Sequence, residues 1–268
     1  MFKNKKTIKR FSEYYDIYSL DSASLLQGNG DKNKVNLSSQ LSISTNYNEG
    51  PCFVDHINNK IYITVTSLDK KEMKQEKRSS NLTNNRLRLM EGDYNNGVIS
   101  NLIEFPYNDI LYNVAHATYS HGTKRLYFAS TMPGSEGESD IFYCTRNNKG
   151  KWGIPKNIGK RVNTSGTESF PYAKNGVLFF ASDNQRKQAG TDLDIYYINE
   201  SEIKTKFPTA LDEINSDQDD YAICFTKDEY KMEGFFTSNR DNKFPGNDDI
   251  YSFEVLKNTT VINEANNW

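Results

Sequence analysis

An internal repeat constrains the fold of this chain more than any other feature of its sequence. Three short aromatic strands each end in a serine, and these residues, Ser130, Ser182 and Ser238, lie 52 and 56 residues apart. A loop that contains glycine and aspartate follows each strand, and an Asp-Ile-aromatic triplet follows each loop. Landmarks that recur in step at a fixed period indicate an architecture in which one supersecondary unit stacks on the next.

The triplets are the second landmark of the repeat. They are Asp140-Ile141-Phe142, Asp194-Ile195-Tyr196 and Asp249-Ile250-Tyr251, and they lie 54 and 55 residues apart. An aspartate that directly follows a turn can accept hydrogen bonds from the N–H groups of the preceding loop. We therefore expect these three aspartates to fix the loops in front of them and to have no catalytic role.

A third landmark precedes the aromatic strand and gives the number of copies. The matching stretches are residues 48–54, 163–173 and 215–225. The earliest copy continues with the strand Lys60–Ser67, a long polar insertion, and Arg86–Glu91. The triplet Asp16-Ile17-Tyr18 near the N-terminus lacks the strands that should precede it. The sequence therefore contains four recognisable repeats and the back half of a fifth.

Each copy contains about four segments of strand length, separated by Gly, Asn, Asp and Pro. In the second copy these segments are Val114–Tyr119, Arg125–Ser130, Asp140–Thr145 and Trp152–Ile158. No segment keeps a 3.6-residue apolar period long enough for a helix. A four-stranded antiparallel unit that recurs every ~50 residues is typical of a β-propeller blade. The predicted fold is all-β: a propeller of four blades and a half blade, from a parent protein expected to have five.

The composition fits short strands whose few buried positions carry aromatic rings. Only 36% of the residues are hydrophobic, yet 13% are aromatic, whereas disordered chains are poor in aromatic residues. The net charge of −2 argues against a nucleic-acid binder that works through a basic surface. Cys52, Cys144 and Cys224 form no C-x-x-C pair and are expected to be small buried residues in strands. No apolar run approaches the roughly 18 residues that a membrane span needs.

The repeats resemble the WD40-like (PD40-type) propeller repeats of OmpA-family, PorE-like cell-envelope proteins of Bacteroidetes. The runs 104–143, 157–185 and 234–253 carry the resemblance, which covers residues 14–255. It implies a non-enzymatic protein-interaction scaffold, periplasmic and outer-membrane-associated, linked to type IX secretion or to peptidoglycan. Envelope proteins, such as outer-membrane or secretion-system components, would be its partners, and it implies no cofactor.

The expected organisation is an N-terminal lead-in over residues 1–13, the propeller over 14–255, and a polar tail over 256–268 without a clear fourth strand. The first ten residues are basic, but neither an apolar segment nor a small-residue cleavage site follows them. The tetratricopeptide and OmpA-like parts of the family do not occur in this sequence. We therefore expect the propeller portion of a longer envelope protein, or a truncated relative.

The sequence shows no catalytic set. The three histidines, His56, His116 and His121, have no G-x-S-x-G nucleophile elbow to pair with. The loops 182–194 and 238–249 are rich in oxygen ligands, but they lack the spacing of a calcium loop, so solvated turns are favoured. No metal site and no enzymatic activity are expected.

Four residues are candidates for contacts in the channel or on the loops. Glu49 and Glu168 come just ahead of the innermost strands and could line the axial channel, although a structural role is favoured for both. His116 opens such a strand and is expected in the core or in the axial channel. Trp152 recurs poorly in the other copies, which makes it a candidate loop contact, although packing at a blade edge is favoured. The alternative to a scaffold is a propeller hydrolase or a glycan or small-ligand sensor acting at this channel. A hydrolase requires two carboxylates, or a carboxylate and His116, to converge there.

Overall fold

The structure is a computed structural model that describes residues 18–19, 35–37, 48–67, 86–185, 192–226, 233–240, 248–256 and 259–264. The described residues form strands, turns and loops and include no helix. No helix in this part of the chain therefore has the length and apolar character needed to cross a membrane. The N-terminal lead-in, the polar insertion and the triplet residues Asp16 and Ile17 lie outside the described residues.

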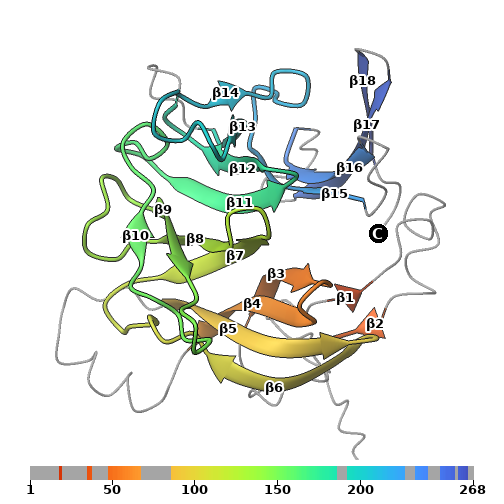
Figure 1. The fold of residues 1–268 in the computed structure, drawn as a ribbon. Coiled ribbons are helices and arrows are strands. Elements are labelled where there is room, and N and C mark those ends of the chain that lie inside the picture. Colours follow the sequence, from red (N-terminus) through yellow and green to blue (C-terminus); the bar gives the residue numbers. More distant parts are fainter. Residues whose placement is uncertain are drawn as a thin grey trace, which may run out of the picture.

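The described strands build four antiparallel four-stranded sheets, which are the blades of a propeller (Figure 1). The first blade contains β3 (Glu49–Asp55), β4 (Lys60–Ser67), β5 (Arg86–Asn95) and β6 (Val98–Glu104). The second contains β7 (Val114–Ser120), β8 (Arg125–Ser130), β9 (Asp140–Thr145) and β10 (Lys156–Asn157). The third contains β11 (Glu168–Lys174), β12 (Val177–Ser182), β13 (Asp194–Asn199) and β14 (Thr209–Ala210). The fourth contains β15 (Asp220–Phe225), β16 (Glu233–Ser238), β17 (Asp249–Leu256) and β18 (Thr259–Glu264).

The predicted all-β propeller is confirmed, and the strands β4, β8 and β9 begin and end where the sequence predicts. The half blade corresponds to a separate two-stranded sheet of β1 (Tyr18–Ser19) and β2 (Val35–Asn36). The C-terminal stretch differs from its prediction, because β18 pairs with β17 and supplies the fourth strand of the last blade. Its β-branched run Thr259-Thr260-Val261-Ile262 has a high strand propensity, which outweighs the polar residues around it.

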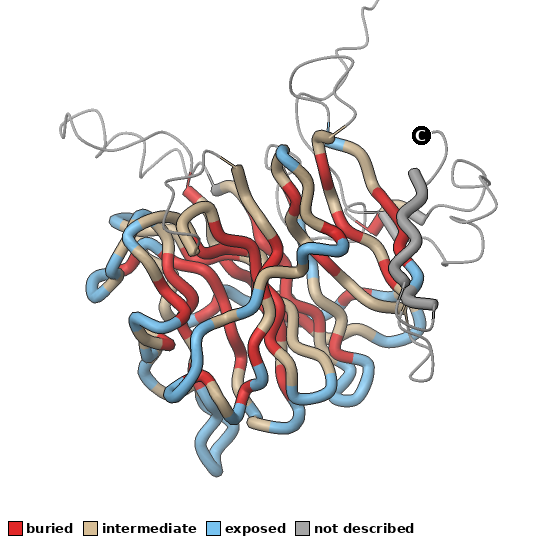
Figure 2. The backbone as a smooth tube through the Cα atoms, turned by 90° about the horizontal axis from the view of Figure 1, so that it is seen from above, coloured by how far each residue is buried: buried red, intermediate tan, exposed pale blue. Residues whose placement is uncertain are grey.

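The blades are held together by apolar cores that form between neighbouring sheets. One cluster joins the first and second blades, another the second and third, and another the third and fourth. The centre of each aromatic strand carries a phenylalanine, and Phe128, Phe180 and Phe236 are at most 1% exposed. Burying one such side chain contributes about 1.5–3 kcal/mol, which explains the high aromatic content. Figure 2 shows buried residues along the strands and exposed residues in the turns.

The third sequence landmark contains an asparagine that makes two hydrogen bonds to the backbone of the preceding blade, an arrangement here called a bracket. The amide side chain of Asn163 accepts from the N–H of Ile141 at 2.9 Å and donates to its carbonyl oxygen at 3.0 Å. Asn215 makes the same two bonds to Ile195, at 2.8 and 2.9 Å. Each bracket therefore ties the loop that enters one blade to the triplet strand of the blade before it.

The motif aspartates differ from one another in their surroundings. Asp140 is fully buried and accepts hydrogen bonds from the N–H groups of Glu136 and Gly137, at 2.8 and 3.1 Å. Asp194 and Asp249 are only half-buried. The terminal serines are buried, and two of them bond the start of their own blade: Ser130 Oγ donates to the Asn113 carbonyl and Ser182 Oγ to Glu168.

Candidate functional site in the axial channel

The first strand of every blade is the innermost one, and each of these strands carries a β-bulge at the same position. The ladder register shifts in β3, β7, β11 and β15 in the same way. The extra residues at these bulges are Gly50, His116, Phe170 and Ala222, and all four have positive φ angles, from 49° to 117°. For the three that are not glycine this conformation costs on the order of 1 kcal/mol each. Strained backbone is typical of functional sites, so its repetition around one axis indicates a functional site in the channel.

Two adjacent cavities follow the axis between the inner strands. The first, here called the rim chamber, has a volume of about 690 Å³. It is lined by the C-terminal ends of the inner strands and by the hairpin turns that follow them. Its lining includes Val54, Ser120, Lys174 and Thr226, which occupy equivalent positions in the four blades. The second, here called the bulge chamber, has a volume of about 440 Å³ and is lined by His116, Phe170 and Ala222. The two chambers share Cys52, Phe53, Tyr172 and Cys224, so they are neighbouring parts of one channel.

A histidine and an aspartate meet at the rim chamber. Nε2 of His121 lies 2.9 Å from Oδ1 of Asp55, and His121 lines the chamber. The Asp55 side chain is 1% exposed, while that of His121 is 37% exposed. Asp55 is held in place because it also accepts from the N–H groups of Ile57 and Asn58, both at 3.1 Å. A buried carboxylate thus orients a solvent-accessible imidazole.

His116 lies deeper in the channel, in the bulge chamber. Its ring stacks on Phe170 with the centroids 3.9 Å apart and the planes 10° apart, and Phe170 in turn contacts Tyr221 at 4.8 Å. Its backbone N–H donates to Thr64 Oγ1 at 2.9 Å. Within the described structure, no group lies within hydrogen-bond distance of the buried Nδ1 atom. Burial lowers the pKa of His116 from 6.5 to about 4, so the ring is neutral at neutral pH.

The cysteines of the inner strands face the channel. Cys52 and Cys224 line both chambers, which differs from the buried strand positions expected for them, whereas Cys144 is buried between blades. The bulge two residues earlier turns the inner strand, and its effect on side-chain direction is not visible in the sequence. Desolvation raises the pKa of Cys52 to about 11, and it also raises the pKa of Cys224. Both thiols therefore remain protonated at neutral pH and are poor nucleophiles.

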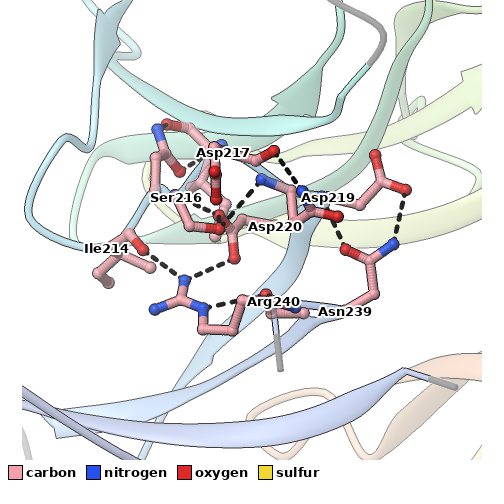
Figure 3. Close-up of polar contacts among 11 residues, drawn as sticks. Ile214, Ser216, Asp217, Asp219, Asp220, Asn239 and Arg240 are labelled. Atoms are coloured by element: carbon pink, nitrogen blue, oxygen red, sulfur yellow. Dashed lines mark hydrogen bonds and ion pairs between the residues drawn. The ribbon is translucent and has the colours of Figure 1, made fainter. Parts of the chain in front are cut away.

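The carboxylates at the other end of the inner strands belong to turns. Glu168 accepts from the N–H and Oγ1 of Thr164 and from Ser182 Oγ, each at 2.7 Å, and burial raises its pKa. Asp220 accepts from the N–H and Oγ of Ser216, at 2.6 and 2.8 Å. It also pairs with Arg240 Nη2 at 2.6 Å, in the network drawn in Figure 3. The hydrogen bonds of both carboxylates stabilise these turns, and neither carboxylate lines a chamber.

The remaining candidates also lie away from the two chambers. Glu49 is buried opposite Val65 in the ladder of the first blade and lines neither chamber. Trp152 packs against the core between the first two blades. Its Nε1 donates to Glu91 at 2.8 Å, and the Arg146 guanidinium lies 4.2 Å from its ring. Of the four candidates, only His116 lines one of the two chambers.

Comparisons with known proteins show no family for this chain. No family model matches the chain, and no curated protein matches it. Among solved structures, an α-L-arabinofuranosidase from Lactobacillus brevis matches with a TM-score of 0.49 at 12% identity, over 87% of this chain and 82% of that one. An exo-1,5-α-L-arabinanase from a bovine ruminal metagenomic library matches with a TM-score of 0.44 at 15% identity, over 88% of both chains. A puromycin-hydrolyzing peptidase of Mycobacterium tuberculosis matches with a TM-score of 0.43 at 10% identity. This chain covers 85% of its own length in that match but spans about a third, 34%, of the peptidase.

The comparisons correct two expectations drawn from the sequence. The matched structures are hydrolases, whereas we expected a non-enzymatic scaffold and no enzymatic activity. With TM-scores below 0.5 and identities of 15% or less, the likeness shows nothing about the reaction or the substrate of this chain. The activity of this chain is therefore argued from its own side chains.

The pair of Asp55 and His121 is not predicted from the sequence, although a signal for it exists. Each residue lies five positions after the bulge residue of its blade, Gly50 or His116. Equivalent positions on the inner strands of adjacent blades lie next to each other around the axis. An alignment of the repeats on the bulge, rather than on the aromatic strand, would have brought these two side chains together.

Proposed function

We propose that this chain is a propeller hydrolase in which His121, oriented by Asp55, acts as a general base at the rim chamber. The observation that carries the proposal is the distance of 2.9 Å between His121 Nε2 and Asp55 Oδ1 at a cavity of about 690 Å³. An imidazole held by a buried carboxylate is the arrangement that general-base catalysis requires.

The Asp55 carboxylate determines which nitrogen of His121 serves as the base. An ionised carboxylate only accepts hydrogen bonds, so Nε2 of the neutral imidazole carries the proton and donates it to Asp55. Nδ1 then keeps its lone pair and can take a proton from a water molecule. Asp55 stabilises the imidazolium that forms and does not itself become protonated.

The lining of the chambers favours acyl substrates over glycosides. Glycoside hydrolysis uses a pair of carboxylates, and the described linings of both chambers contain no Asp or Glu. The rim chamber does contain Lys174, whose ammonium group can stabilise a negative charge that develops on a carbonyl oxygen. We therefore propose an ester or an amide as the substrate.

The proposed step balances without a cofactor. The oxygen of a water molecule bonds to the acyl carbon while its proton moves to Nδ1 of His121. The bond from the acyl carbon to the alcohol or amine then breaks, and the leaving group takes the proton from the imidazolium. The products are a carboxylic acid and an alcohol or amine, and the enzyme returns to its starting state.

The cellular setting is a separate proposal. The resemblance of the repeats to those of OmpA-family, PorE-like envelope proteins supports a periplasmic, outer-membrane-associated location, in which other envelope proteins are its neighbours. Fractionation of cells that express the natural gene tests this location. Recovery in the periplasmic or outer-membrane fraction is expected, and recovery with the cytoplasmic proteins would contradict it.

Hydrolysis of chromogenic substrates tests the proposed activity. Purified protein is assayed with p-nitrophenyl esters, peptide p-nitroanilides and p-nitrophenyl α-L-arabinofuranoside. We expect turnover of esters or anilides, and a loss in kcat/KM of roughly 10²–10⁴-fold in the His121→Gln variant. The control is Lys124→Gln, an exposed change on the same hairpin, which should keep wild-type activity. Equal activity of the wild type and His121→Gln, or turnover of the arabinofuranoside alone, would contradict the proposal.

A further inference from the structure

We infer that the bulge chamber binds an uncharged aromatic ring that carries one hydrogen-bonding group. The inference rests on the shape and lining of this chamber and on the unpaired nitrogen of His116. It does not depend on hydrolysis at His121, because the rim chamber and the bulge chamber have different polar groups.

The chamber exists because the bulge residues differ among the four blades. The bulge positions of β7 and β11 carry rings, His116 and Phe170, which stack on each other between adjacent blades. The same position is Gly50 in β3 and Ala222 in β15, so the first and fourth blades contribute almost no side-chain volume there. The volume of about 440 Å³ is well above the roughly 150 Å³ cavity that suffices for benzene.

The lining selects for an uncharged ligand. Apart from the ring of His116, the described residues around the bulge chamber are aromatic or aliphatic side chains, prolines and the two protonated thiols. No charged group among them is available to balance an anion or a cation, and burying an unpaired charge is strongly unfavourable. A sugar would lose the hydrogen bonds of several hydroxyl groups, since few polar partners face it.

The stacked rings select for a flat ligand. His116, Phe170 and Tyr221 form a column of rings from three blades, with centroid distances of 3.9 and 4.8 Å. Aromatic rings add to such columns in offset-stacked or edge-to-face contacts. Tyr172 and Phe53 supply further aromatic surface around the same space.

His116 supplies a polar contact for the ligand. The residue is half-buried and lines the chamber, and Nδ1 has no hydrogen-bond partner within the described structure. A polar ring that lacks partners is costly, so a ligand group that bonds the imidazole gains affinity. A hydroxyl group both donates and accepts, and therefore suits either tautomer of the imidazole. A phenolic ring satisfies all of these conditions.

Calorimetric titration of the purified protein with 2-naphthol tests the inference. The comparison probes are naphthalene, which lacks the hydroxyl group, and 2-naphthoate, which is anionic. We expect 2-naphthol to bind most tightly and 2-naphthoate most weakly. In His116→Phe, which places at β7 the residue that β11 carries, the advantage of 2-naphthol over naphthalene should fall by roughly threefold to tenfold.

Filling the chamber should weaken both neutral probes. Ala222→Phe copies the bulge residue of β11 into β15, and we expect it to weaken the binding of 2-naphthol and naphthalene at least about tenfold. Ala222→Leu is the second variant if the larger ring prevents folding, as judged by the urea midpoint. His121→Gln should bind 2-naphthol as the wild type does, which separates this inference from the proposed hydrolysis. Tighter binding of 2-naphthoate than of 2-naphthol, or unchanged affinity in a folded Ala222 variant, would overturn it.

Discussion

The two ends of the inner strands use buried carboxylates in different ways. At the beginning of β11 and β15, Glu168 and Asp220 bind the turn that leads into their own strand, and Asp220 also binds Arg240. At the end of β3, Asp55 holds its hairpin turn but also reaches the neighbouring blade, where it meets His121 at a cavity. The carboxylates at the beginning of the inner strands therefore stabilise the propeller ring, whereas the carboxylate at the end of β3 belongs to the proposed active site.

The two ends also differ in whether the same type of residue recurs at the equivalent position of successive repeats. The turn-binding carboxylates occupy the same place in the third and fourth repeats, where each one binds the turn that leads into its own blade. The position of Asp55 and His121 is Asn175 in the third blade, so its residue type changes from blade to blade. In a repeat protein, the positions that vary around the axis can be specialised without loss of the fold.

The largest effect on stability is expected at the ring-building end. Asp220 is fully buried and its partner Arg240 is 17% exposed, so Asp220→Ala leaves a largely buried guanidinium without its partner. We expect the free energy of unfolding to fall by about 3–5 kcal/mol. Urea denaturation measures it, and Glu104→Gln is the control, since Glu104 is 57% exposed and pairs with Arg88 at the surface. A loss of less than about 1 kcal/mol in Asp220→Ala would show that this end is not what holds the ring.

A somewhat smaller effect is expected from the titration of His116. Its pKa is about 4 in the folded protein and near 6.5 when unfolded, so only the unfolded chain takes up a proton between these values. The stability that the neutral ring contributes is therefore present above pH 6.5 and is lost as the pH falls toward 4, by up to about 3 kcal/mol.

The measurement is the difference in unfolding free energy between the wild type and His116→Phe at pH 7 and at pH 4.5. Glu168 has a raised pKa and therefore stabilises the folded protein as the pH falls, which opposes the effect of His116. Because both proteins contain Glu168, its contribution cancels when the two free energies are subtracted. The wild type should lose more stability than the variant on acidification. Equal losses would mean that His116 is not enclosed as the structure shows.

A smaller effect is expected at one of the brackets between blades. Asn163→Ala leaves the buried N–H and carbonyl groups of Ile141 without their side-chain partner, so we expect a loss of about 1–3 kcal/mol. Asn215→Ala should behave alike, because it makes the same two bonds to Ile195. Thermal unfolding of both variants checks this, and a loss in only one of them would refute the equivalence of the brackets.

The sequence was sufficient for features that depend on local pattern. The strands β4, β8 and β9 were predicted residue for residue, since alternating apolar residues between turn signals specify a strand locally. The bulges were not predicted, because a bulge is a property of the register between two strands. The pair of Asp55 and His121 joins residues that are 66 positions apart, so it becomes visible only when two blades are packed together.

The sequence favours a structural role for the candidate carboxylates but does not exclude a channel contact. Glu49 and Glu168 lie just ahead of inner-strand positions, and an adjacent position says nothing about side-chain direction. The structure turns Glu168 toward Thr164 and Ser182, and it buries Glu49 in the first blade. His116 lines the bulge chamber, and its packing against Phe170 becomes visible only in the structure.

The most direct test of the functional end is the kcat/KM of Asp55→Asn for a p-nitrophenyl ester, per folded molecule. Asparagine keeps one side-chain oxygen for the turn at Ile57 and Asn58, so the urea midpoint should change little. It cannot stabilise the imidazolium of His121, and we expect kcat/KM to fall by roughly 10²-fold or more. Wild-type kcat/KM in a folded Asp55→Asn protein would contradict the account.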